Sequence, residues 1–253
     1  MPADTIRKWE QRYGVLRPAR TPGGQRRYTE LDVARVEWLK ARLAEGFRIG
    51  EAAELLGTAD VAGTTPDDLC TAIVDATVRI DVGALRSAIG QALLLDSLEE
   101  TFADVLAPAL VEIGDLWETG EVTVAQEHLA SGAIRASLLR LLADQRGSVR
   151  GSAVLACAPG ESHEVGLLML AILLRADGWQ VAYLGPNTPV ADAVALARGL
   201  GASEVMFSAT RDEALTSLHT ELNDVRVPTG MELLIGGAAT GRRAAAETVA
   251  ALH

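Results

Sequence analysis

The strongest constraint on the fold is a regular alternation of apolar runs and helical patterns from residue 151 onward. Four runs have the length of a buried strand: SAVLACA (152–158), WQVAYLG (179–185), SEVMFSA (203–209) and MELLIGG (231–237). Helical patterns follow them at about 163–177, 189–200, 212–222 and 241–252. Strand–helix–strand units of this length form right-handed crossovers between parallel strands. The sequence therefore predicts an α/β domain with a parallel sheet over 148–253.

The preceding zone, 67–147, has a helical pattern throughout. Its four predicted helices cover 67–79, 81–95, 97–118 and 123–145, and Pro108 is its only proline. Aromatic residues make up only 4% of the chain, so cores must be built from Ala, Leu and Val, a composition that suits helices. Because the connections are short, neighbouring helices should be antiparallel, as in a four-helix bundle.

The N-terminal zone, 1–57, is basic and helical, and a linker over 58–66 follows it. Helices are expected from Asp4 to about residue 11, over 29–44 and over 48–56, with a turn-rich segment around 18–24. The chain as a whole carries a net charge of −11, whereas residues 1–30 hold seven basic and three acidic side chains. A basic head on an acidic body excludes nucleic-acid binding over the whole surface and leaves it open for the head.

Several classes of protein are excluded by simpler signals. No apolar run is long enough to span a membrane, and the N-terminus has no apolar signal-peptide core. The two cysteines, Cys70 and Cys157, lack metal-type spacing, so a structural zinc or a disulfide framework is not expected. We therefore expect a soluble, cytoplasmic protein.

Polar and small residues follow three of the predicted strands. His163 follows the first strand, Ser208 ends the third, and Gly236-Gly237 ends the fourth. Open α/β sheets bind ligands at these carboxyl ends, and Glu161 could fix the tautomer of the imidazole. Each signal alone is weak, since a loop histidine has many roles and Gly-Gly often marks a turn.

Taken together, Glu161-x-His163-x-x-Gly166, Ser208-Ala-Thr210 and Gly236-Gly237 resemble the cobalamin-binding signature of the corrinoid-protein superfamily. The resemblance implies a Rossmann-like domain in which His163 replaces dimethylbenzimidazole as the lower cobalt ligand. It also implies that the nucleotide tail of the cofactor threads between strands beside Ser208 and the two glycines. The acid is aspartate in most members, whereas this chain has Glu161.

A second group lies at one end of the predicted bundle. Trp117 ends the third helix, and a capping box at Thr123-x-x-Gln126 places Glu127 and His128 about one turn inside the fourth. On local evidence these residues could equally be a core tryptophan and a solvated helix surface. Trp117-x9-Glu127-His128 nevertheless resembles the upper-ligand motif of CarH/LitR-type regulators. That resemblance implies adenosylcobalamin, with Trp117 packed on the adenosyl group and Glu127 bonded to its ribose.

The N-terminal segment 4–14, the following turn and Arg26-Arg27-Tyr28 resemble the recognition helix and wing of MerR-type DNA-binding domains. A basic helix in the major groove and a wing on the phosphates would bind through counterion release. The residues so implied in DNA binding are Arg7, Lys8, Arg12, Arg20, Arg26, Arg27 and Tyr28. Compared with that family, we expect the chain to lack a first helix before Asp4, and compared with cobalamin domains a last strand and helix.

The combined prediction is a cobalamin-dependent, light-responsive transcriptional regulator of the MerR/CarH type, without enzymatic turnover. By resemblance, adenosylcobalamin would bind between bundle and α/β domain and promote a homo-oligomer, for example a tetramer, that represses promoter DNA until light cleaves the cobalt–carbon bond. Glu118 occupies a position that is often histidine in the light-sensing relatives. Two alternatives remain open: a corrinoid methyl-carrier protein, and a regulator that binds another tetrapyrrole or no cofactor.

Overall fold

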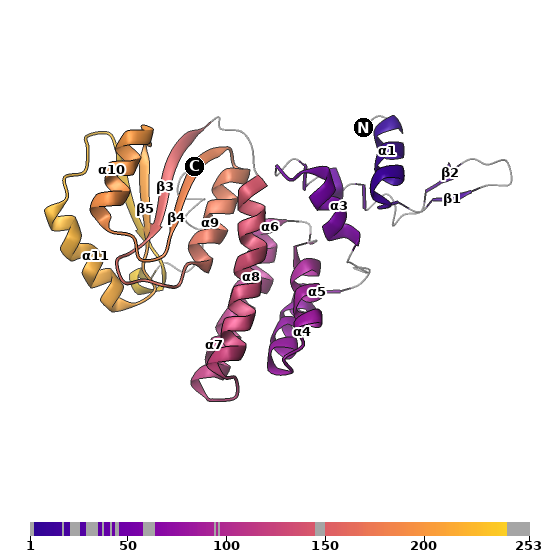
Figure 1. Cartoon of the computed structure of the whole chain (residues 1–253), viewed down its shortest axis with the longest axis horizontal. Helices are drawn as coiled ribbons and strands as arrows, with labels where there is room; N and C mark the ends of the chain where they lie inside the picture. The colour runs from indigo at the N-terminus through magenta and orange to yellow at the C-terminus, as the bar shows by residue number, and fades with distance from the viewer. Residues whose placement is uncertain are drawn as a thin grey trace. The chain divides into compact units, whose positions relative to one another are not determined.

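The chain forms two compact units, Met1–Ala133 and Ile134–His253 (Figure 1). The computed structural model describes residues 3–241 except 17, 21–25, 29–34, 37, 41, 44–45, 58–63, 94, 96 and 145–149. The helix predicted over 241–252 therefore lies outside the described residues from 242 onward. Within the described part of the chain, no helix is both long and apolar enough to cross a membrane.

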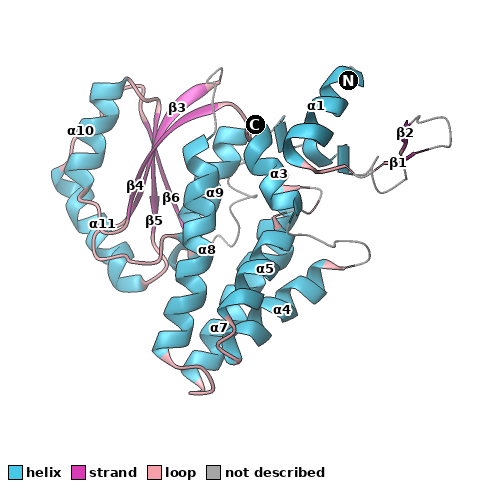
Figure 2. Ribbon diagram, turned by 45° about the vertical axis from the view of Figure 1, so that its right-hand side comes forward, coloured by secondary structure: helices cyan, strands magenta, loops and turns pink. Residues whose placement is uncertain are grey.

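A parallel four-stranded sheet is the centre of the second unit. Its strands are β3 (Gly151–Cys157), β4 (Trp179–Gly185), β5 (Glu204–Ser208) and β6 (Glu232–Gly236), in the order β4-β3-β5-β6. Helix α9 (Val165–Ala176) covers one face, and α10 (Val190–Leu200) and α11 (Asp212–Asp224) cover the other (Figures 1 and 2). The predicted α/β fold with a parallel sheet is confirmed.

Burial on both faces explains the apolar runs. Residues 153–157 of β3 are all buried, and so is every residue of α9 from Leu167 to Leu174. The chain leaves β3 toward β4 on one side and later returns to β5 on the other. The chain therefore leaves β3 and β5 in opposite directions, and this switch point is the position at which open α/β sheets bind ligands.

Helices fill the middle of the chain. They are α4 (Pro66–Val78), α5 (Val82–Ala92), α6 (Leu98–Glu100), α7 (Ala107–Glu118) and α8 (Val124–Asp144), and all four predicted helical segments are present. Thr65 and Asp68 form a reciprocal capping box, so α4 begins at Pro66, within the stretch predicted as linker. Helix α8 has its first residues, 124–133, in the first unit and the remainder in the second.

A π-helical segment, Thr101–Leu106, joins α6 to α7. The amide of Ala107 donates to the carbonyl of Phe102, five residues earlier. Pro108 follows immediately, and a proline inside a helix cannot donate and crowds the preceding turn. The wider π turn accommodates that proline, which is why the predicted helix over 97–118 is divided in this way.

The N-terminal part of the first unit contains α1 (Ala3–Tyr13), α3 (Ile49–Gly57) and a short antiparallel hairpin. The hairpin strands are β1 (Ala19–Arg20) and β2 (Arg26–Arg27). Arg26 of the hairpin donates to Glu10 of α1 at 2.7 Å, which ties the hairpin to the helix. Of the helix predicted over 29–44, the described residues 35–36, 38–40 and 42–43 are helical.

Candidate functional site

Glu161 organises the loop that follows β3. Its side chain is fully buried, with an exposed fraction of 0%. It accepts hydrogen bonds from the amide and Nδ1 of His163 at 2.9 and 2.6 Å, and from the amide and hydroxyl of Thr210 at 2.7 and 2.6 Å. The amide of Arg211 donates at 3.1 Å. One carboxylate thus joins the loop after β3 to the loop after β5.

These hydrogen bonds keep Glu161 charged. Burial raises the pKa of its carboxyl, but the hydrogen bonds from Thr210 and His163 outweigh burial and lower the pKa to about 2. An ionised carboxylate can only accept, so Nδ1 of His163 carries a proton, and in the neutral ring the lone pair is on Nε2. The His163 side chain is 63% exposed, so this nitrogen is available to a ligand from outside the loop.

Neighbouring loops lock the same segment in place. The amide of Gly160 donates to the side chain of Asn187 at 2.7 Å, and the amide of Asn187 donates back to the Glu161 carbonyl at 2.8 Å. Asn187 has φ = 50°, a left-handed conformation that asparagine tolerates better than most residues. The guanidinium of Arg211 donates to the Gly160 carbonyl. Asn187 and Arg211 were not among the predicted site residues.

The glycines after β6 have separate roles. Gly237 has φ = 107°, and a Cβ there would lie 2.3 Å from the carbonyl oxygen of Ala209, so only glycine fits. A Cβ at Gly236 or Gly166 would meet none of the described atoms within 4 Å. Ser208 is paired in register with Gly236 at the ends of β5 and β6. Small residues therefore occupy the ends of β5 and β6, beside the loop that carries His163.

The bundle group lies at the start of α8 and the end of α7. Trp117 is 48% exposed. The carboxylate of Glu127 contacts Nδ1 of His128, whose side chain is 73% exposed. The amide of Val122 donates to the Leu116 carbonyl at 3.0 Å, which folds the connection tightly. The three predicted upper-ligand residues therefore share one end of the helices, on an exposed surface.

The predicted capping box of α8 is present. The amide of Thr123 donates to the Gln126 side chain at 3.0 Å, and the amide of Gln126 donates back to the Thr123 hydroxyl at 3.3 Å. The Gln126 side chain also donates to the carbonyl of Val78 at 3.0 Å. This contact fixes the start of α8 against the end of α4.

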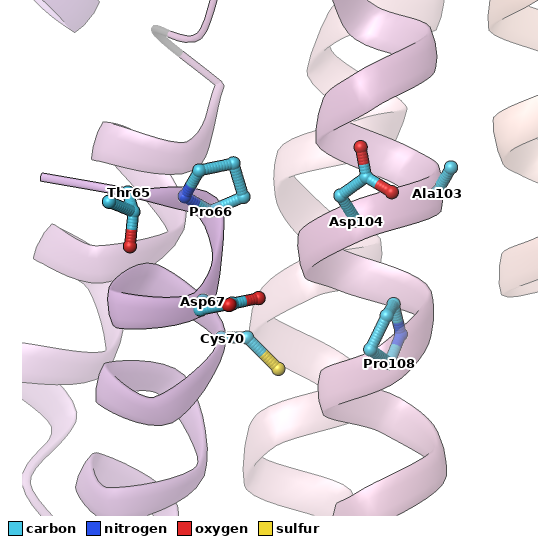
Figure 3. Close-up of a pocket in the computed structure, with 7 residues that line it drawn as sticks. All are labelled: Thr65, Pro66, Asp67, Cys70, Ala103, Asp104 and Pro108. Carbon is cyan, nitrogen blue, oxygen red and sulfur yellow. The ribbon is translucent and has the colours of Figure 1, made fainter.

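A separate hollow lies at the beginning of α4. It is lined by Thr65, Pro66, Asp67, Cys70, Ala103, Asp104 and Pro108 (Figure 3). None of the predicted site residues lines it. Burial raises the pKa of the Cys70 thiol, with smaller contributions from Glu112 and Asp67, so this thiol is protonated at neutral pH.

The predicted DNA-binding residues are divided between α1 and the hairpin. Arg7, Lys8 and Arg12 are exposed on α1, and Tyr28 is 37% exposed after β2. Arg26 is engaged by Glu10, a pairing that sequence reasoning did not anticipate. Arg20 and Arg27 lie on the two strands, but their side chains are outside the described residues.

Comparison with known proteins decides the family. Residues 1–58 match the MerR HTH family of regulatory proteins, and residues 69–142 and 151–250 match two B12-binding domain families. The HTH-type transcriptional repressor CarH of Myxococcus xanthus is 38% identical, over 93% of this chain and 84% of its own length. The chain belongs to the family of MerR-type regulators with B12-binding domains.

Further similarities agree with membership of this MerR/B12-binding family. The repressor CarA of Myxococcus xanthus is 32% identical over 74% of this chain and 65% of its own length. The monomethylamine corrinoid protein of Methanosarcina barkeri has a similar fold, with a TM-score of 0.58 and 20% identity over 74% of this chain and 98% of that one. The MerR/B12-binding family thus joins a corrinoid-protein fold to a MerR head.

Proposed function

We propose that this chain is a transcriptional repressor that binds adenosylcobalamin in the dark and is released from DNA by light. The observation that carries the proposal is the buried, ionised Glu161 that holds Nδ1 of the exposed His163 at 2.6 Å. A histidine fixed in this way by a carboxylate is the usual arrangement of a metal-binding imidazole. Because the corrin ring would itself bind the cobalt, one imidazole nitrogen from the protein would suffice to hold it.

The residues present fit this cofactor. Nε2 of His163 would hold the cobalt from below, while Glu161 sets the tautomer and orientation of the ring. The unfilled space beside Gly166 and Gly236 leaves room for the nucleotide tail along Ser208. When bound, adenosylcobalamin supplies a cobalt–carbon bond that visible light cleaves.

The bundle group would recognise the upper ligand. Trp117 offers an exposed aromatic face on which the adenosyl group can pack, and Glu127 offers a carboxylate to the ribose hydroxyls. Both contacts require a nucleoside, so they would distinguish adenosylcobalamin from cobalamins with a smaller upper ligand. His128 would support Glu127 through their mutual hydrogen bond.

The head would bind promoter DNA. The names of the relatives CarH and CarA indicate repression. Exposed Arg7, Lys8 and Arg12 on α1 suit a helix in the major groove, and the hairpin with Arg20, Arg26, Arg27 and Tyr28 suits a wing. We assign residues 1–57 to this head, 58–66 to a linker, 67–147 to the cofactor cap and 148–253 to the corrinoid domain. The repressing form would be a homo-oligomer, for example a tetramer.

Illumination provides the test. The protein is loaded with adenosylcobalamin in the dark, and its absorption spectrum, its oligomeric state and its gel shift of DNA from its own promoter region are recorded before and after green light. We expect a spectral change, dissociation of the oligomer and loss of the shift, whereas methylcobalamin should not support the dark complex. A dark complex that is indifferent to light and to the upper ligand would contradict the proposal and favour a methyl carrier or another cofactor.

A further inference from the structure

A second buried carboxylate follows His163 directly, and the proposed cobalt site does not use it. The side chain of Glu164 is only 8% exposed. It accepts hydrogen bonds from Nε of Arg135 in α8 and from the hydroxyl of Tyr183 in β4, the latter at 2.6 Å. Glu164 is the N-cap of α9, yet its carboxylate caps none of the described amides of that helix. The side chain is therefore committed to α8 and β4.

The surroundings of Glu164 keep its partners in defined protonation states. The pKa of Tyr183 is raised, first by burial and then by its hydrogen bond to Glu164, so the phenol stays protonated and donates. The pKa of Cys157 is raised to about 12, chiefly by burial and then by Glu164 and Glu161. This neutral thiol lies 3.7 Å from the carbonyl oxygen of His163. Arg135 is thus the cation that faces Glu164 among the groups described around it.

The His163 segment is consequently held from both ends. At one end, two residues before His163, the Glu161 carboxylate accepts hydrogen bonds from Thr210 and Arg211 in the loop after β5. Glu164, at its other end, is bonded to α8 and β4. A rotation of the His163 backbone must break one of these attachments. Because β4 and β5 belong to the same sheet, α8 is the attachment that can change without disrupting the strands.

We propose that Arg135, acting through Glu164, is a positioning residue for His163 and makes the lower-ligand geometry depend on helix α8. The inference rests on the proposed role of His163 as the cobalt ligand. The first turn of α8 also carries Glu127 and His128, so a single helix bears residues proposed for the upper ligand and the residue that positions the lower one. Displacement of α8 loosens the bond between His163 and cobalt.

Separate variants distinguish a positioning role of the Arg135–Glu164 pair from a purely structural one. Arg135→Met leaves a buried carboxylate without its cation, which destabilises folded proteins in general. Arg135→Met combined with Glu164→Gln removes both charges and keeps an acceptor for Tyr183, so it breaks the link with less cost to folding. Arg140→Met is the matched control, because Arg140 is exposed on the same helix and donates to Ser137 one turn earlier.

The experiment measures His163 coordination with cob(II)alamin as the probe. In the parent protein, the electron paramagnetic resonance spectrum should show nitrogen splitting from the imidazole, and Arg140→Met should preserve it. Arg135→Met and the double variant should show a fraction without that splitting and bind aquocobalamin about tenfold more weakly, at the lower end for residues behind a metal ligand. Thermal unfolding of the same proteins without cofactor records stability independently.

Each result decides between the hypotheses. Full nitrogen splitting and parental affinity in the double variant would overturn the positioning role, whatever its unfolding temperature. Loss of splitting in the double variant, with an unfolding temperature close to that of Arg140→Met, would support it. Absence of splitting in the parent protein itself would overturn the proposed function, and this inference with it.

Discussion

The loop after β3 and the exposed end of the bundle differ in how much of their geometry the fold determines. Glu161 is 0% exposed and is bonded to His163, Thr210 and Arg211, whereas Trp117 is 48% exposed and the His128 side chain 73%. Preorganised contacts are formed without further loss of entropy on binding, but exposed side chains must be ordered by their ligand. We infer that the first region provides affinity for any cobalamin and that the second distinguishes among upper ligands.

The largest effect is expected from His163→Ala. Removal of the imidazole takes the proposed cobalt ligand from the preformed loop, so aquocobalamin binding, measured by absorption titration, should weaken by more than about 100-fold. His219→Ala, an exposed histidine of α11, serves as the control and should bind like the parent. An unaltered visible spectrum of bound cobalamin in His163→Ala would contradict the proposed role of His163. The comparison between the two regions depends on that role.

Glu161→Gln should weaken binding by about 10- to 100-fold and also change the pH dependence of stability. The carboxyl has a pKa of about 2 in the folded protein against an ordinary value of 4.5. Since the folded pKa is the lower one, its stabilisation is complete above about pH 5 and is lost as pH falls toward 2. Urea unfolding of the cofactor-free protein should show the parent losing about 3 kcal/mol more than Glu161→Gln across that interval. Parallel pH profiles would show that Glu161 is not preorganised.

Trp117→Leu and Glu127→Gln probe the other side of the comparison. Each should weaken adenosylcobalamin binding by about 1–2 kcal/mol and leave methylcobalamin affinity nearly unchanged. Because both residues are partly or largely exposed, the free energy of unfolding should fall by less than about 1 kcal/mol. Equal affinity of the unmodified protein for the two cobalamins would contradict a discriminating role for this surface.

The smallest expected effect is that of Glu118→His. Glu118 is exposed at the end of α7, and a carboxylate is a poorer partner than imidazole for the cobalt of cobalamin. The substitution should leave the affinity for adenosylcobalamin in the dark unchanged. After illumination it should give the absorption spectrum of cobalamin bound by two histidines, which the unmodified protein should lack. A bis-histidine spectrum in the unmodified protein that survives His128→Ala would contradict this expectation.

The parts of the site that the sequence predicted are those encoded by local spacing. The four strands lie within one residue of their predicted bounds, because each buried strand is a continuous apolar run between turns. The pairing of Glu161 with His163 follows from a separation of two residues after a strand. Arg211 and Arg135 were not predicted, since each reaches the loop from a distant segment and resembles an ordinary surface residue in the sequence.

In the N-terminal head, too, the sequence did not reveal a contact between residues that are distant along the chain. Arg26 was assigned to a phosphate-binding wing through its resemblance to MerR-type domains, yet the structure also gives it Glu10 as a partner, sixteen residues earlier. The sequence gives the number of cationic side chains in a segment, but it does not show which of them form ion pairs with carboxylates of the same protein. On α1, Arg7 is likewise paired with Asp4 at 3.1 Å, so the exposed Lys8 and Arg12 remain the stronger candidates for DNA contact.

The π-helical segment Thr101–Leu106 has a consequence for the surface proposed to contact the upper ligand. Each residue added to or removed from a helix turns everything after it by about 100°. Trp117 lies downstream of that segment, so the direction of its indole is set by the length of a turn near Pro108 rather than by its own neighbours. A one-residue deletion there would re-aim the tryptophan while leaving every residue of the motif in place. The direction of Trp117 therefore depends on the helix phase set upstream as well as on the motif itself.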